Sequence, residues 1–134
     1  MIKLKIQKDS KDSSTVAKIV IVDNEGRVLF LERSKYHKKY AGELDLPGGH
    51  IKEQESILKG LERELHEETG LRLEHVSFFK QVGNKHYFHA RYNSQPIKLS
   101  DEHTDYGFYN KEQLDSKEKF QKIAIKVLEM LKNG

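Results

Sequence analysis

The chain has no cysteine among its 134 residues, which excludes disulfide bonds and metal sites built from thiolates. No apolar run approaches the ~20 residues that a membrane span requires, and the N-terminal MIKLKIQKDS has no apolar stretch of signal-peptide length. These absences favour a cytoplasmic protein without a membrane partner. The net charge of +3 is small and dispersed, so it does not indicate nucleic-acid binding but is compatible with small anionic substrates.

Repeats, low-complexity tracts and an obvious linker are absent as well. Hydrophobic residues make up 36% and charged residues 34% of the chain, and apolar segments recur along its whole length. This composition is polar for a globular protein, but it does not indicate disorder. We therefore predict one domain over residues 1–134 with a single modest core.

Alternation of apolar and polar residues predicts several strands. Residues 2–6 (IKLKI) alternate, and residues 17–22 and 27–32 flank DNEG, a strong hairpin signal. Residues 76–82 and 86–92 predict a second strand pair around GNK, and a short strand is expected at residues 106–109. Strands thus surround one internal helix and precede a final helix. The pattern favours an α+β or α/β sandwich.

The final helix is predicted from an apolar stripe at helical spacing, which we interpret as a packing surface. Its members are Phe120, Ile123, Ala124, Val127, Leu128 and Leu131.

The internal helix is predicted over residues 56–69, with Ser56 as its cap and Gly70 as its left-handed stop. At about 100° per residue, Glu68 lies about 20° from Leu61, inside the apolar stripe. Glu64 lies near the edge of that stripe, at about 60°, and Glu67 farther round, at about 120°. An acidic helix face is usually a solvated face, but Glu68 does not belong to a polar face.

These three glutamates also repel one another and oppose the helix dipole, because they lie close together in the last turns. A divalent cation would relieve both effects. Since the cluster offers only oxygen ligands, a hard ion such as Mg²⁺ or Mn²⁺ suits it. Gly60, in the middle of the helix, permits two readings: room for a phosphate beside the metals, or room for a tightly packed strand.

The segment from Gly49 to Leu71 resembles the signature box of the Nudix hydrolases at every specified position. It reads Gly49-x5-Glu55-x7-Arg63-Glu64-Leu65-x-Glu67-Glu68-x-Gly70-Leu71. The resemblance implies an α/β/α sandwich with a mixed sheet. It also implies cleavage of the diphosphate linkage of a nucleoside diphosphate derivative, with Mg²⁺ or Mn²⁺ as cofactor.

Position by position, the resemblance assigns the metal to Glu64, Glu67 and Glu68 together with the carbonyl of Gly49. It assigns to Glu55 and Arg63 a supporting ion pair that orients the loop and the helix. The chain departs from common family features at Glu43-Leu44, which replace an aromatic residue before LPGG, and at Phe108, where tryptophan is frequent. Neither departure touches the metal ligands, but both bear on base recognition.

The general base is left open between two alternatives. A metal-bound water needs a proton acceptor, and relatives often supply a glutamate from the loop before the late strand. Glu102 matches that position best, with Asp101 and His103 as neighbours, and a box glutamate is the alternative. If none of these residues takes part in the reaction, the segment DEHTD is an ordinary acidic turn.

Candidate substrate contacts are Arg33, Lys35 and Lys39 in a basic loop, although a solvated basic loop is the more common explanation for such residues. Tyr87 stands where relatives that act on dinucleoside polyphosphates often carry a tyrosine, and Phe108 is the candidate base contact. The short chain resembles the branch that removes nucleoside triphosphates. We expect a monomer or homodimer acting on a small nucleotide, with a nucleic acid involved only through its nucleotide 5′ end. A catalytically silent nucleotide-binding or sensing module is the alternative.

Overall fold

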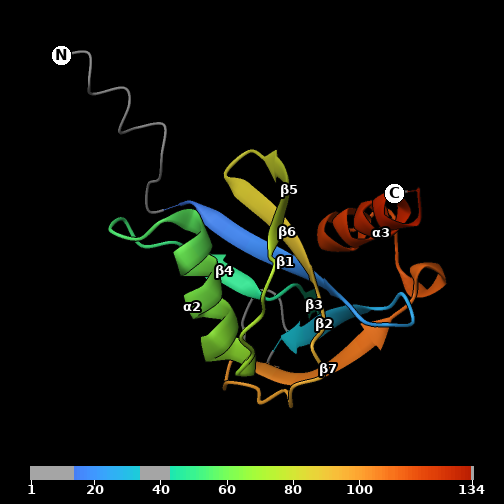
Figure 1. The fold of residues 1–134 in the computed structure, drawn as a ribbon, viewed down its shortest axis with the longest axis horizontal. Helices are drawn as coiled ribbons and strands as arrows, with labels where there is room; N and C mark the ends of the chain where they lie inside the picture. The colour runs from blue at the N-terminus through green and yellow to red at the C-terminus, as the bar shows by residue number, and fades with distance from the viewer. Residues whose placement is uncertain (1–13, 34–42, 134) are drawn as a thin grey trace.

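The chain is described here by a computed structural model covering residues 14–33 and 43–133. Figure 1 shows a mixed β-sheet between two helices. The strands are β1 (Val16–Val22), β2 (Val28–Arg33), β3 (Leu44–Asp45), β4 (Gly48–His50), β5 (Ser77–Val82), β6 (Lys85–Arg91) and β7 (His103–Tyr109). The helices are α2 (Ile57–Thr69), the short 3₁₀ helix η1 (Lys111–Gln113) and α3 (Lys119–Asn133). The strand predicted at residues 2–6 lies outside the described residues.

The sheet has the order β3-β2-β1-β6-β5, with β4 added on β1 and β7 on β2. Only the β1–β6 pairing is parallel among the described strands, and the others are antiparallel. The hairpin around DNEG and the β5–β6 pair confirm the two predicted strand pairs. Because β4 pairs with the first residues of β1, Gly48 and Gly49 lie beside Lys18 and Ala17.

The central strand β1 is buried on both faces, as expected for a strand that is apolar apart from Lys18. Ala17, Ile19 and Ile21 face the core beneath α2, together with Leu61 and Leu65. The alternate residues Val20 and Val22 face a second core beneath α3. The chain therefore forms an α/β/α sandwich, with one helix on each face of the sheet.

The predicted ends of α2 are confirmed. The Ser56 side chain accepts a hydrogen bond from the backbone N–H of Lys59, and Gly70 adopts the left-handed conformation at φ 77°. In α3, Phe120, Ile123, Ala124 and Val127 are buried as predicted, whereas Leu131 is 42% exposed. The stripe thus ends one turn earlier than its spacing suggests.

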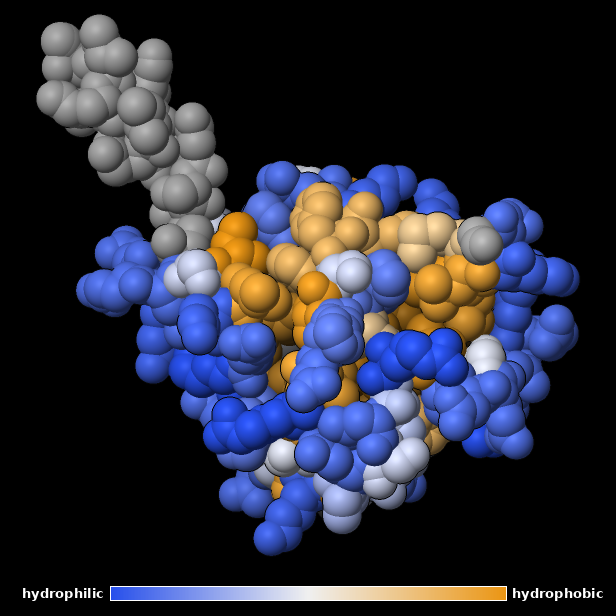
Figure 2. All heavy atoms as spheres, in the orientation of Figure 1, coloured by the Kyte–Doolittle hydropathy of each residue, from blue (hydrophilic) through white to orange (hydrophobic). Residues whose placement is uncertain are grey.

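The face of the sandwich seen in Figure 2 is largely polar, with apolar atoms exposed among the polar side chains. Figure 2 shows apolar atoms over β5 and α3, the elements that carry the exposed hydrophobic residues Phe78, Val82 and Leu131. No helix within the described ranges is long and apolar enough to cross a membrane.

Candidate metal and catalytic site

A cleft of about 550 Å³ opens where β1, β4, the end of α2 and the start of β7 meet. Its acidic wall consists of Glu64, Glu68 and Glu102. The first two come from α2, and the third comes from the turn before β7, so residues far apart in the sequence share one wall.

Glu68 is buried in this wall, with only 5% of its surface exposed. One carboxylate oxygen, Oε1, accepts a hydrogen bond of 2.9 Å from the backbone N–H of Gly48. Burial raises the pKa of Glu68 to about 8, although Lys18 and this hydrogen bond act in the opposite direction. The position inside the apolar stripe, predicted from the helical spacing, is confirmed.

Glu64 occupies the adjacent turn of α2 and is half-buried. Burial raises its pKa, Arg63 opposes this shift, and the negative charges of Glu67 and Glu102 add to it. The carboxyl group of Glu64 lies directly over Gly49, where an added Cβ would be 2.7 Å from its Cδ. Only a residue without a side chain allows β4 to approach Glu64 so closely.

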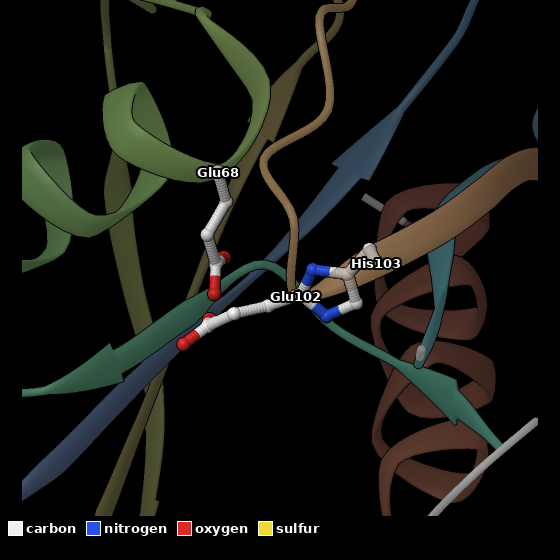
Figure 3. A group of neighbouring side chains, drawn as sticks. All are labelled: Glu68, Glu102 and His103. Atoms are coloured by element: carbon white, nitrogen blue, oxygen red, sulfur yellow. The ribbon is translucent and has the colours of Figure 1, made fainter. Parts of the chain in front are cut away.

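Glu102, in the turn before β7, brings a third carboxylate to the same place. Within the described part of the chain, one ligand atom each from Glu68, Glu102 and His103 all lie within 4.8 Å of one another. Figure 3 shows the Glu68 and Glu102 carboxylates converging, with the imidazole ring of His103 beside them.

This arrangement fits the divalent ion that the sequence implies. Two of the carboxyl groups have raised pKa values because burial and mutual repulsion disfavour their negative charge, and a cation would relieve both effects. The missing side chain at Gly49 leaves its backbone next to the Glu64 carboxylate. Glu67 is 57% exposed in its side chain, contacts Arg63 at 3.3 Å and does not line the cleft.

The predicted contact between Glu55 and Arg63 is present. Arg63 donates two hydrogen bonds to Glu55, from Nε at 3.0 Å and from one terminal nitrogen at 2.7 Å. Arg63 also contacts the backbone carbonyl of His50 at 3.2 Å and thereby connects the loop before α2 to the helix. The hydrogen bonds from Arg63 lower the pKa of Glu55 to about 2, and the same contact raises the pKa of Arg63.

Gly60 packs against this loop. A Cβ there would lie 2.6 Å from Cδ1 of Ile51 and 2.8 Å from Oε1 of Glu55. Gly60 therefore makes room for close packing rather than for a phosphate, but the packed segment is this loop and not the expected strand.

A buried ion-pair network beneath the cleft was not predicted. Lys18 Nζ donates to Asp45 Oδ1 and to the carbonyl of Leu46, both at 3.0 Å, and to the carbonyl of Gly48 at 3.2 Å. Arg33 contacts the same Asp45 oxygen at 3.1 Å. The available signal was one lysine inside the apolar run AKIVIV, together with an aspartate in LDLPGG.

Of the predicted substrate contacts that the structure describes, only Arg33 lines the cleft. Arg33 lines the cleft, whereas Lys35 and Lys39 lie outside the described residues. Tyr87 is only 1% exposed and packs edge-on against Phe120 in the core beneath α3. Phe108 packs against Tyr92 beside the other core and does not line the cleft. The predicted contact of Tyr87 is corrected, because core packing takes up its side chain, whereas the half-buried Phe108 stays a prediction.

The chain matches the NUDIX domain model over residues 13–130. It is similar to the structure of the MutT protein from Methanosarcina mazei Go1, with 24% identity, a TM-score of 0.65, and coverage of 90% of this chain and 95% of that chain. For the MutT NUDIX hydrolase from Burkholderia pseudomallei, the identity is 23%, the TM-score 0.63 and the coverage 84% and 95%. A binary complex of a C. elegans Ap4A hydrolase is similar as well, with 24% identity and a TM-score of 0.57. The match covers 73% of this chain and 80% of that chain. No curated protein sequence matches the chain significantly.

Proposed function

The chain belongs to the NUDIX family of hydrolases, and we propose that it is a divalent-metal-dependent pyrophosphohydrolase. Its reaction would be cleavage of the diphosphate linkage of a nucleoside diphosphate derivative by attack of water on phosphorus. The observation that carries this proposal is the convergence of Glu64, Glu68 and Glu102 on one wall of the cleft.

Glu64, Glu68 and the carbonyl of Gly49 would hold the ion, with Glu67 as a further carboxylate from the same helix. When bound, Mg²⁺ or Mn²⁺ neutralises the phosphate oxygens and lowers the pKa of a water molecule. The close approach of Gly49 to Glu64 and the hydrogen bond from Gly48 to Glu68 support this assignment. Both contacts hold β4 against the acidic face of α2.

The remaining residues orient groups and move a proton. Arg63 fixes Glu55 through two hydrogen bonds and so holds the loop before α2. Glu102 would accept the proton of the attacking water, and a box glutamate is the alternative acceptor. The water oxygen forms a bond to phosphorus while the bond from phosphorus to the bridging oxygen breaks. The leaving phosphate takes that electron pair.

The substrate is a nucleoside triphosphate or a dinucleoside polyphosphate in this proposal. Likeness to proteins described as MutT and as Ap4A hydrolase supports these two classes. Arg33 lines the cleft, where it pairs with Asp45 at 3.1 Å, and would meet a phosphate. With Tyr87 buried in the core and Phe108 outside the cleft lining, contacts to the base would come from other residues.

A panel of nucleoside triphosphates, dinucleoside polyphosphates and nucleotide sugars tests the proposal. Each compound is incubated with the protein and Mg²⁺ or Mn²⁺, and the phosphate-containing products are separated by chromatography. We expect turnover of at least one class, with loss in chelator and recovery on addition of metal. Binding without turnover across the panel would instead favour a catalytically silent nucleotide-binding or sensing module.

A further inference from the structure

One ring nitrogen of His103 is buried without a partner. His103 begins β7 and is 6% exposed. Its Nε2 lies 3.1 Å from Oδ2 of Asp45, whereas Nδ1 has no hydrogen-bond partner among the described residues. Buried polar atoms in folded proteins are nearly always satisfied, so an orphaned nitrogen at a cleft indicates a missing ligand.

The contact with Asp45 determines which nitrogen carries the proton. Asp45 also accepts a hydrogen bond of 3.0 Å from Lys18 and lies 3.1 Å from Arg33, and these two cations favour its ionised form. An ionised carboxylate only accepts hydrogen bonds, so Nε2 must be the donor. In the neutral imidazole, Nδ1 then has a free lone pair.

The lone pair lies beside two carboxylates. A ligand atom of His103 and the carboxylate oxygens of Glu68 and Glu102 lie within 4.8 Å of one another, and the ring adjoins both side chains in Figure 3. A histidine that donates one N–H to a carboxylate and directs its other nitrogen elsewhere has the arrangement typical of metal-bound histidines.

We propose that His103 Nδ1 is a nitrogen ligand of a divalent cation, which it binds together with Glu68 and Glu102. The inference rests on the metal site of the proposed function and adds a ligand that the acidic box does not contain. Asp45 orients the imidazole and is itself held by Lys18, so it acts as a positioning residue.

The nitrogen ligand has a consequence for the choice of metal. Mg²⁺ prefers oxygen ligands and retains its waters, whereas imidazole binds Mn²⁺ and later first-row ions more readily. We therefore expect the site to bind Mn²⁺ more tightly than Mg²⁺. Replacing His103 should narrow the difference between the two affinities.

Pulsed electron paramagnetic resonance of Mn²⁺ bound to the full chain tests the ligand directly. We expect hyperfine coupling to a coordinated imidazole nitrogen in the wild type, and a change in that coupling when histidine is labelled with ¹⁵N. The coupling should vanish in His103→Gln and persist in His66→Gln, an exposed histidine of α2. Absence of nitrogen coupling in the wild type overturns the proposal, even if the variants fold poorly.

Metal affinity provides a second readout. Titration calorimetry should show that His103→Gln weakens Mn²⁺ binding by at least about tenfold and Mg²⁺ binding by less than about threefold. Equal losses for both ions, or none, would contradict a nitrogen ligand. The melting temperature of the metal-free variant reports whether the fold is retained. Turnover that persists without nitrogen coupling leaves the proposed function intact, while coupling without turnover leaves the ligand assignment intact.

Discussion

Gly49 lies so close to Glu64 that a Cβ on the glycine would be 2.7 Å from the carboxyl carbon of the glutamate. The neighbouring Gly48 is restricted in a different way. Its φ is +127°, and a Cβ there would lie 2.0 Å from the backbone carbonyl oxygen of Ala17. One glycine thus makes space for a movable side chain, and the other for a fixed strand.

The two glycines should therefore respond differently to alanine. In Gly49→Ala, the Glu64 carboxylate can swing aside, so we expect a stability loss of only about 1 kcal/mol. Binding of Mn²⁺ should nevertheless weaken by at least about tenfold, because Glu64 is displaced. In Gly48→Ala, the strained backbone and the clash with β1 should lower stability by about 3 kcal/mol or more.

Urea denaturation and Mn²⁺ titration of both variants check this pair. If Gly49→Ala binds Mn²⁺ like the wild type, the contact between Gly49 and Glu64 does not serve the metal. If Gly48→Ala is as stable as Gly49→Ala, the backbone argument for Gly48 is wrong.

Proton release should accompany metal binding because of Glu68. The pKa of its carboxyl group is raised to about 8 in the metal-free protein, so Glu68 is largely protonated at neutral pH. A cation requires the carboxylate, and binding should release close to one proton per ion at pH 7 and little above about pH 9. Calorimetry in buffers of different ionisation enthalpy measures this number.

The raised pKa of Glu68 also makes the stability of the metal-free protein depend on pH. Because the folded pKa of about 8 exceeds the reference 4.5, the contribution of Glu68 is fully present below about pH 4.5 and is lost as the pH rises through about 8. Glu68→Gln retains an oxygen for the Gly48 N–H and cannot ionise. Its metal-free stability should not show this decline, and an unchanged profile would contradict the assigned burial effect.

The acidic box and its helix could be predicted because their signals are local. The spacing of Glu68 relative to Leu61 placed a carboxylate in the core face, and Ser56 and Gly70 marked the ends of α2. Lys18 and Asp45 could not be paired from the sequence, because 27 residues separate them and only the folded sheet, in which β2 pairs with both β1 and β3, brings them together. Tyr87 was misplaced for a related reason. Strand alternation leaves open which face of a sheet a helix covers, and α3 covers the face that carries Tyr87.

The buried pair of Lys18 and Asp45 should contribute strongly to stability. Their side chains are 8% and 3% exposed, and the nitrogen and oxygen atoms are 3.0 Å apart. Asp45→Asn leaves the buried ammonium of Lys18 without an anionic partner, and we expect a loss of about 3–5 kcal/mol. The double variant with Lys18→Met should be less destabilised than the sum of the two single variants. Additive losses in chemical denaturation would mean that the two charges do not interact.

The ion pair of Glu55 and Arg63 predicts a second pH range in which the stability of the fold changes. The pKa of Glu55 is lowered from 4.5 to about 2, chiefly by hydrogen bonds from Arg63. Its stabilising contribution is therefore present above about pH 4.5 and is lost as the pH falls through about 2. At neutral pH, Glu55→Gln should lower stability by about 2 kcal/mol. The difference from wild type should shrink in acid, and a constant difference from pH 7 to pH 2 would contradict this account.

Glu102 is the predicted proton acceptor, and its position allows a specific test. Its carboxylate shares the cleft with Glu64 and Glu68, while its side chain is exposed and lies outside both described core clusters. Glu102→Gln should therefore leave the fold intact and lower kcat by at least about tenfold. KM should change little, because the lost interaction belongs to the transition state.

Asp101→Asn is the matched control for this variant, since Asp101 is the exposed neighbour in the same turn and does not line the cleft. It should retain the wild-type kcat. If Glu102→Gln also retains full kcat, the acceptor is a box glutamate, and Glu64→Gln then becomes the variant that removes the step. The pH–rate profile separates the two roles of Glu102. Loss of a proton acceptor abolishes the acidic limb of the profile, whereas loss of a metal ligand lowers kcat across the whole range and is partly restored by higher metal concentration.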